Sequence, residues 1–182
     1  MKDETIEKCL GVIQHADFSL YKHCVKTAEI AKEMGYELGT DFETLYEAGL
    51  VHDIGKLAIP KSILVKTDTL SKVDRSVINL HPFNGYCLLQ NFGVDEKICE
   101  IVLFHHGFDK PFYNLELVYD DDVIYLSKIL RCADCFAALT SERVYRPKTK
   151  IEKTISIMKN DDDLDQEMVS VLEKLYYRKE GE

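Results

Sequence analysis

The sequence predicts an all-α protein that folds as a single domain over residues 1–182. Apolar residues recur every three or four positions in one segment after another, as they do on the buried face of a helix. No run of four or more positions alternates apolar and polar residues in the manner of a strand. No internal repeat, low-complexity tract or Pro/Gly linker divides the chain. With 182 residues and 46% apolar content, the chain can bury a substantial core.

The first helices are expected over residues 18–34 and 41–54. Gly35 and a second glycine four residues later end the first of them. Asp41 is a good N-cap for the second helix, because its carboxylate can accept hydrogen bonds from free amides of the first turn. The apolar face of this helix includes His52, so we expect the imidazole of His52 to point into the core.

Residues that favour the first turn of a helix predict the helices that follow. Ser71 or Asp74 can begin a helix that runs toward His81. Because proline is acceptable in the first turn of a helix, Pro82 favours a new helix that begins there and ends near Leu89. Periodicity then predicts four further helices, over residues 95–106, 122–140, 150–158 and 164–177.

Charge and composition limit the function classes. The net charge of −9 argues against stable DNA or RNA binding, which normally needs a basic excess. No run of about 20 apolar residues and no charged-then-apolar start is present, so we expect a cytoplasmic protein that does not enter a membrane. The six cysteines lie mostly in helix-like segments and are expected to be reduced, buried thiols.

The histidines are spaced as if each served one shared site. His23, His52, His81, His105 and Asp134 follow one another at intervals of 29, 29, 24 and 29 residues, each about one helix plus a connection. Helices of such length can direct one ligand each to a common point in a bundle. A single histidine on a helix face is more often a hydrogen-bonded core residue. Burying several imidazoles and carboxylates together, however, is costly unless a cation balances them.

The adjacent pair His52-Asp53 suits a metal site of this kind. An aspartate can bridge two cations with its two oxygens while the neighbouring imidazole binds one of them. A ligand set of imidazoles and carboxylates suits Fe, Mn, Zn, Co or Ni.

The order of His23, His52-Asp53 and Asp134 resembles the H…HD…D ligand order of the HD superfamily of metal-dependent phosphohydrolases. The segments HDIGKLAIPKSIL, LHPFNGYCLL, IVLFHH and RCADCFAALTSERVYR are most similar to HD-GYP domains, bacterial phosphodiesterases that linearise cyclic di-GMP. The likeness extends from about residue 18 to 177. It implies an all-α HD-type bundle in which metal ligands converge from several helices.

The resemblance also implies roles for individual residues. The implied metal ligands are His23, His52, Asp53, His81, His105, His106 and Asp134. The implied catalytic residues are Asp53 and Lys56, and the implied substrate contacts are Lys56, Tyr113, Arg143 and Arg146. The implied cofactor is a pair of divalent transition-metal ions, with Fe or Mn favoured and Zn, Co or Ni open. Some members bind a third metal through a glutamate four residues before the first histidine, but that position is Ser19 here.

One loop departs from the family pattern. The run after His106 is GFDKPFYN in place of DGxGYP; it keeps Asp109 and Tyr113 but has Lys110 and Phe112 in place of the glycines. Three interpretations therefore stay open. The first is a cyclic di-GMP phosphodiesterase that uses a metal-activated hydroxide. The second is an HD phosphohydrolase acting on another cyclic dinucleotide or a nucleoside monophosphate. The third is a catalytically weak signalling module that binds a nucleotide or a partner protein. The oligomeric state stays open in all three interpretations.

Overall fold

The computed structural model describes residues 4–66, 68–107, 120–141 and 149–180, and it confirms the all-α class, since no strand occurs among these residues. Ten α-helices and one 3-10 helix, η1, follow one another along the described chain. Their bounds are α1 Glu4–Ala16, α2 Phe18–Leu38, α3 Phe42–Val51, η1 Ile54–Ala58, α4 Lys61–Leu64, α5 Lys72–Ile78, α6 His81–Phe92, α7 Glu96–Phe104, α8 Asp121–Thr140, α9 Ile151–Lys159 and α10 Gln166–Glu180.

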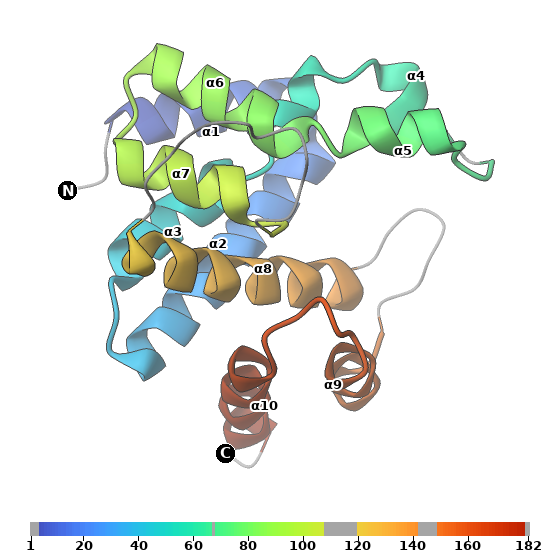
Figure 1. Ribbon diagram of the computed structural model, residues 1–182. Helices are drawn as coiled ribbons and strands as arrows, with labels where there is room; N and C mark the ends of the chain where they lie inside the picture. The colour runs from blue at the N-terminus through green and yellow to red at the C-terminus, as the bar shows by residue number, and fades with distance from the viewer. Residues whose placement is uncertain (1–3, 67, 108–119, 142–148, 181–182) are drawn as a thin grey trace.

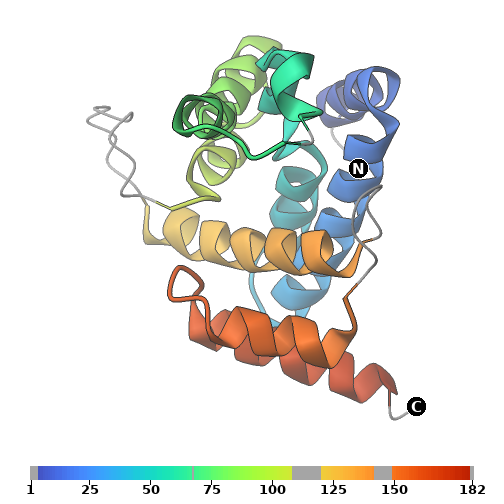
Figure 2. The same ribbon diagram turned by 90° about the vertical axis from the view of Figure 1, so that its right-hand side faces the viewer.

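Two long helices, α2 and α8, organise the bundle. Helix α2 packs most extensively on α3 and α8, and α7 joins α6 to α8. Helix α6 also packs closely on η1. Figures 1 and 2 show α9 and α10 together on the side of α8 away from α6 and α7. The helices α2, α3, α6, α7 and α8 therefore pack around one another, and we call the region where they meet the centre of the fold.

Several expected helix starts are present. The side chain of Asp41 accepts a hydrogen bond from the Thr44 amide at 3.1 Å and caps α3. Ser71 caps α5, and Asp74 completes a reciprocal capping box with it. Helix α6 carries a proline in its first turn, as Pro82 predicts. The structure thus confirms these three starts. They could be predicted because each depends on local side-chain and backbone chemistry.

Other boundaries differ from the expectation. Helix α2 does not end at Gly35 but continues to Leu38, and it ends at Gly39, whose φ is 65°. Gly35 serves packing instead, since a Cβ there would lie 2.7 Å from Leu45 Cδ1 and 3.0 Å from Phe42 Cα. Helix α3 ends at Val51, so Asp53 lies between α3 and η1 and not inside a helix.

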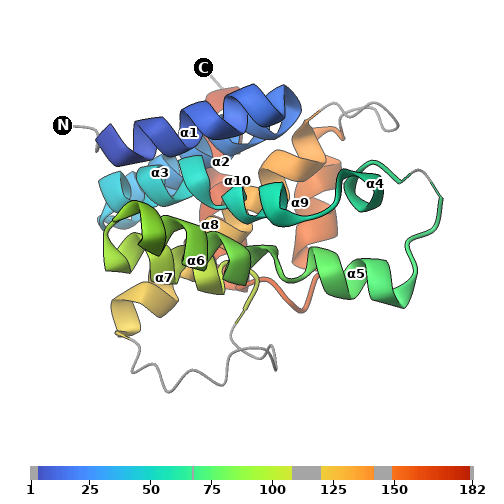
Figure 3. The same cartoon turned by 90° about the horizontal axis from the view of Figure 1, so that it is seen from above.

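Two elements were not expected at all. Helix α1 buries Ile6, Cys9 and Ile13 against the bundle. Helix α4 is only four residues long and forms a hairpin with α5, which we call the α4–α5 hairpin (residues 61–66 and 68–78). The two helices pack chiefly on each other, and Figures 1 and 3 show the hairpin extending from the helical body.

The state of the cysteines agrees with the sequence analysis. All six cysteines lie among the described residues and none forms a disulfide; Cys9, Cys24, Cys99 and Cys132 are buried. Among the described helices, none is both long enough and apolar enough to cross a membrane.

Candidate metal centre

The fold brings all seven of the expected ligand side chains to its centre. Helix α2 supplies His23, the connection between α3 and η1 supplies His52 and Asp53, the start of α6 supplies His81, the segment directly after α7 supplies His105 and His106, and α8 supplies Asp134. Their ligand atoms form three overlapping groups, and within each group all atoms lie within 4.8 Å of one another. The groups are His81–His105–His106, His23–His52–Asp53 and His52–His105–Asp134.

Three of the imidazoles are held in the same way by the backbone. In each, Nδ1 donates to the carbonyl oxygen of the residue three positions earlier. The pairs are His52 with Gly49 O at 2.8 Å, His81 with Ile78 O at 2.7 Å and His105 with Val102 O at 2.6 Å. A carbonyl oxygen can only accept, so Nδ1 carries the hydrogen and, in a neutral ring, Nε2 is left as a lone pair. This is the arrangement that orients histidines as metal ligands.

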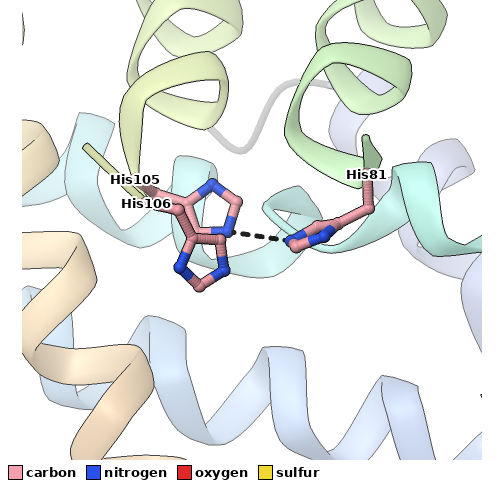
Figure 4. A group of neighbouring side chains, drawn as sticks. All are labelled: His81, His105 and His106. Carbon is pink, nitrogen blue, oxygen red and sulfur yellow. Dashed lines mark hydrogen bonds between the residues drawn. The ribbon is translucent and has the colours of Figure 1, made fainter. Parts of the chain in front are cut away.

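The rings of His81 and His105 face each other through these nitrogens. Their Nε2 atoms lie 3.4 Å apart, as the dashed line in Figure 4 marks. A hydrogen bond between them would require an imidazolium. Burial lowers the pKa of His81 to about 4 and the pKa of His105 well below its usual value, so both rings are neutral near pH 7. Both rings therefore offer a lone pair that would serve as a ligand to a divalent cation.

Asp53 lies between the imidazoles and is itself buried. Its Oδ1 lies 3.3 Å from His81 Nε2, and its Oδ2 lies 3.6 Å from His23 Nε2 and 3.5 Å from His52 Nε2. Within the described residues, Asp53 Oδ1 and His52 Nε2 are buried without a hydrogen-bond partner. Since a buried polar atom is costly when unsatisfied, the donor set fits divalent cations that the two carboxylate oxygens would share.

Asp134 closes the centre from the α8 side. Its Oδ1 lies 2.8 Å from His23 Nε2 and 3.6 Å from His52 Nε2. Burial would raise the pKa of Asp134, but its bonds to these two histidines hold the pKa well below its usual value. Burial likewise lowers the pKa of His52, yet Asp53, Cys24 and Asp134 together outweigh this effect and the net pKa lies well above the usual value.

The ammonium of Lys56, in η1, forms an ion pair with the Asp53 carboxylate. Its Nζ lies 2.5 Å from Asp53 Oδ2, and its side chain is 27% exposed. Burial opposes the charged form of Lys56, but Asp53 raises its pKa above the usual value, so the ammonium persists. The pKa of Asp53 is in turn lowered: burial would raise it, and the charges of Lys56 and His52 more than compensate.

Two residues at this centre were missed in the sequence analysis. Cys24, one position after His23, is fully buried, and it contributes to the raised pKa of His52. Gly55 lets η1 approach α6, because a Cβ there would lie 1.9 Å from His81 O. The expected substrate contacts Tyr113, Arg143 and Arg146 lie outside the described residues, as does the altered loop after Gly107.

A family model of the HD domain matches residues 10–168, and the chain belongs to this family. The chain is 32% identical over 150 residues to the 3'3'-cGAMP-specific phosphodiesterase 1 of Vibrio cholerae serotype O1, covering 78% of this chain and 33% of that protein. It is 28% identical over 177 residues to a cyclic di-GMP phosphodiesterase of the same organism, covering 86% of this chain and 36% of that protein. The chain thus spans about a third of the length of these curated relatives.

Solved structures show the same fold. The HD domain of the L. monocytogenes phosphodiesterase PgpH superposes with a TM-score of 0.66 at 18% identity, covering 90% of this chain and 92% of that chain. The same domain in complex with cyclic-di-AMP gives a TM-score of 0.64. The expected HD-type helical bundle is therefore confirmed.

Proposed function

We propose that this chain is a metal-dependent phosphodiesterase domain that hydrolyses the 3'-5' phosphodiester bond of a cyclic dinucleotide, with cyclic di-GMP as the first candidate. The observation that carries the proposal is the position of the buried Asp53 carboxylate. Its Oδ1 faces Nε2 of His81, and its Oδ2 faces Nε2 of His23 and of His52. The names of the relatives, which include phosphodiesterases of cyclic di-GMP and of 3'3'-cGAMP, support this substrate class.

The proposed cofactor is a pair of divalent transition-metal ions, Fe or Mn by preference, with Zn, Co or Ni as alternatives. Imidazole nitrogens and carboxylate oxygens suit these ions. Asp53 would be shared between the two ions. The proposed further ligands are His23, His52 and Asp134 for one ion and His81, His105 and His106 for the other.

Bound ions of this kind polarise phosphoryl oxygens and lower the pKa of water. The chain's own groups would perform the remaining work. Lys56 would donate hydrogen bonds from its ammonium to an oxygen of the phosphodiester, where negative charge grows during the reaction. The lowered pKa of Asp53 keeps its carboxylate ionised and available near pH 7. We assign phosphate contacts to Arg143 and Arg146 and a substrate contact to Tyr113 on the family resemblance alone.

The test is turnover by protein reconstituted with Mn or Fe under anaerobic conditions. We expect cyclic di-GMP to give the linear dinucleotide or GMP, and Asp53→Asn to give none. Asp162→Asn, on the exposed α9–α10 loop, removes the same charge at a residue outside the proposed ligand set and should leave the rate unchanged. Absence of turnover of cyclic di-GMP, 3'3'-cGAMP and cyclic di-AMP by loaded protein would refute the proposed activity.

Two alternatives predict other outcomes. A panel of nucleoside monophosphates and other phosphate esters would identify an HD phosphohydrolase of different specificity. A protein that binds no metal after reconstitution but still binds a cyclic dinucleotide or a protein partner would instead be a signalling module.

A further inference from the structure

The α4–α5 hairpin lies in the chain between two segments that carry groups of the metal centre. The chain leaves the centre at Lys56 in η1 and returns to it at His81, the first residue of α6. Figures 1 and 3 show the hairpin between these points extending from the body on the side where α8 ends. The hairpin is therefore connected at both ends to segments that carry groups of the centre.

The hairpin is basic in an acidic protein. Residues 60–78 contain four cationic and two acidic side chains, a net charge of +2 in a chain of net charge −9. Lys66 is paired with Asp74 at 2.7 Å. The other three cations, Lys61, Lys72 and Arg75, are exposed, and no carboxylate of the described chain lies within ion-pair distance of them. Their charge is available to a bound anion.

The hairpin also exposes aliphatic side chains. Val73 of α5 is 72% exposed, Val65 at the end of α4 is 59% exposed, and Leu64 is 39% exposed. A nucleotide presents an apolar base face and an anionic phosphate, and a surface that combines aliphatic groups with unpaired cations is complementary to both.

We propose that the α4–α5 hairpin is the subsite for the half of a cyclic dinucleotide that does not react. Lys61, Lys72 and Arg75 would attract the second phosphate, and Val65 and Val73 would lie against its base. This inference rests on the proposed function, because it requires a substrate with two phosphates. The cations are exposed, so their attraction acts through water within about 10 Å at 0.1 M salt and weakens as salt is added.

The first test is equilibrium binding of cyclic di-GMP by calorimetry, which does not depend on turnover. For the double variant Lys72→Glu/Arg75→Glu we expect the Kd to rise about tenfold at low salt, and the difference should shrink at high salt. Val65→Ser/Val73→Ser should weaken binding by a factor that salt does not change. The matched control Lys8→Glu/Lys174→Glu alters net charge equally on exposed positions of α1 and α10 and should bind as wild type does.

The second test compares two substrates of the loaded protein. The small diester bis(para-nitrophenyl) phosphate has one phosphate and reports the metal centre alone. We expect Lys72→Glu/Arg75→Glu to raise the KM for cyclic di-GMP while kcat and the rate with the small diester stay at wild-type values.

The outcomes separate the two proposals. Turnover of the small diester but of no cyclic dinucleotide would refute the proposed function, while the binding experiment would still decide on the subsite. The subsite is overturned if wild type binds no cyclic dinucleotide, if the control variant weakens binding as much as the hairpin variant, or if the hairpin variant slows both substrates by the same factor.

Discussion

The substitution Gly55→Ala tests how tightly η1 is packed on α6, and hence how the centre is held together. A Cβ on Gly55 would lie 1.9 Å from His81 O and 2.4 Å from Gly85 N. Both atoms belong to the backbone, so no change of rotamer can relieve the overlap. Helix α6 and η1 would have to separate by about 1 Å, which is a severe case of overpacking.

The expected loss follows from this overlap. Overpacking a well-packed core typically costs about 1–3 kcal/mol, and because backbone must move here we expect a loss of about 3 kcal/mol in the free energy of unfolding. In a chain of this size that loss lowers the Tm by about 6–12 °C. The same separation would widen the distance of 3.3 Å between Asp53 Oδ1 and His81 Nε2, so metal affinity should fall as well.

Denaturant unfolding of chelator-treated protein measures the effect without a contribution from metal. Gly11→Ala is the matched control, because a Cβ there meets no atom within 4 Å and the residue lies inside α1. We expect this control to gain about 0.5–1 kcal/mol, since alanine loses less conformational freedom in a helix than glycine does. The reasoning is wrong if Gly55→Ala unfolds at the wild-type denaturant concentration, or if both variants shift in the same direction.

Three further predictions concern the centre itself. Asp53→Asn should lower the metal content per chain, measured by elemental analysis, while the circular dichroism spectrum stays helical; unchanged metal content would contradict the bridging role. Lys56→Met should keep its metal but lose about 10²–10³ in kcat if its ammonium stabilises charge on the phosphoryl group, and a wild-type rate would exclude that role. Burial lowers the pKa of His81 from 6.5 to about 4. Between these pH values the unfolded chain therefore binds more protons than the folded chain. Metal-free protein should lose about 3 kcal/mol in its free energy of unfolding as the pH falls through this window. His81→Gln lacks this contribution, so urea unfolding at about pH 7 and about pH 4.5 should show a flatter pH dependence than wild type; equal slopes would contradict the assignment.

Local signals in the sequence predicted much of the fold. Asp41, Ser71 and Pro82 mark helix starts through hydrogen bonds and dihedral preferences that need no tertiary structure. The inward direction of His52 follows from the periodicity of its helix. The convergence of the histidines and Asp134 followed from intervals that match one helix plus one connection, and the structure does bring these side chains together.

Tertiary contacts decided the features that were predicted wrongly or missed. Gly35 looks like a helix end, but it lies within α2. Glycine is needed at this position because α3 packs too closely to leave room for a Cβ. Helix α4 is too short for periodicity to show. The three Nδ1 bonds to backbone carbonyls depend on how each helix ends, and the partnerless Asp53 oxygen depends on which helices surround it. None of these is encoded in a short stretch of residues.

Anomalous scattering at the iron and manganese edges, from crystals of protein reconstituted anaerobically, is the most direct test of the central claim that this histidine and aspartate cluster binds metal. We predict two peaks on either side of Asp53, one near His23 and Asp134 and the other near His81 and His105. A fully loaded sample with no peak among these side chains would contradict it.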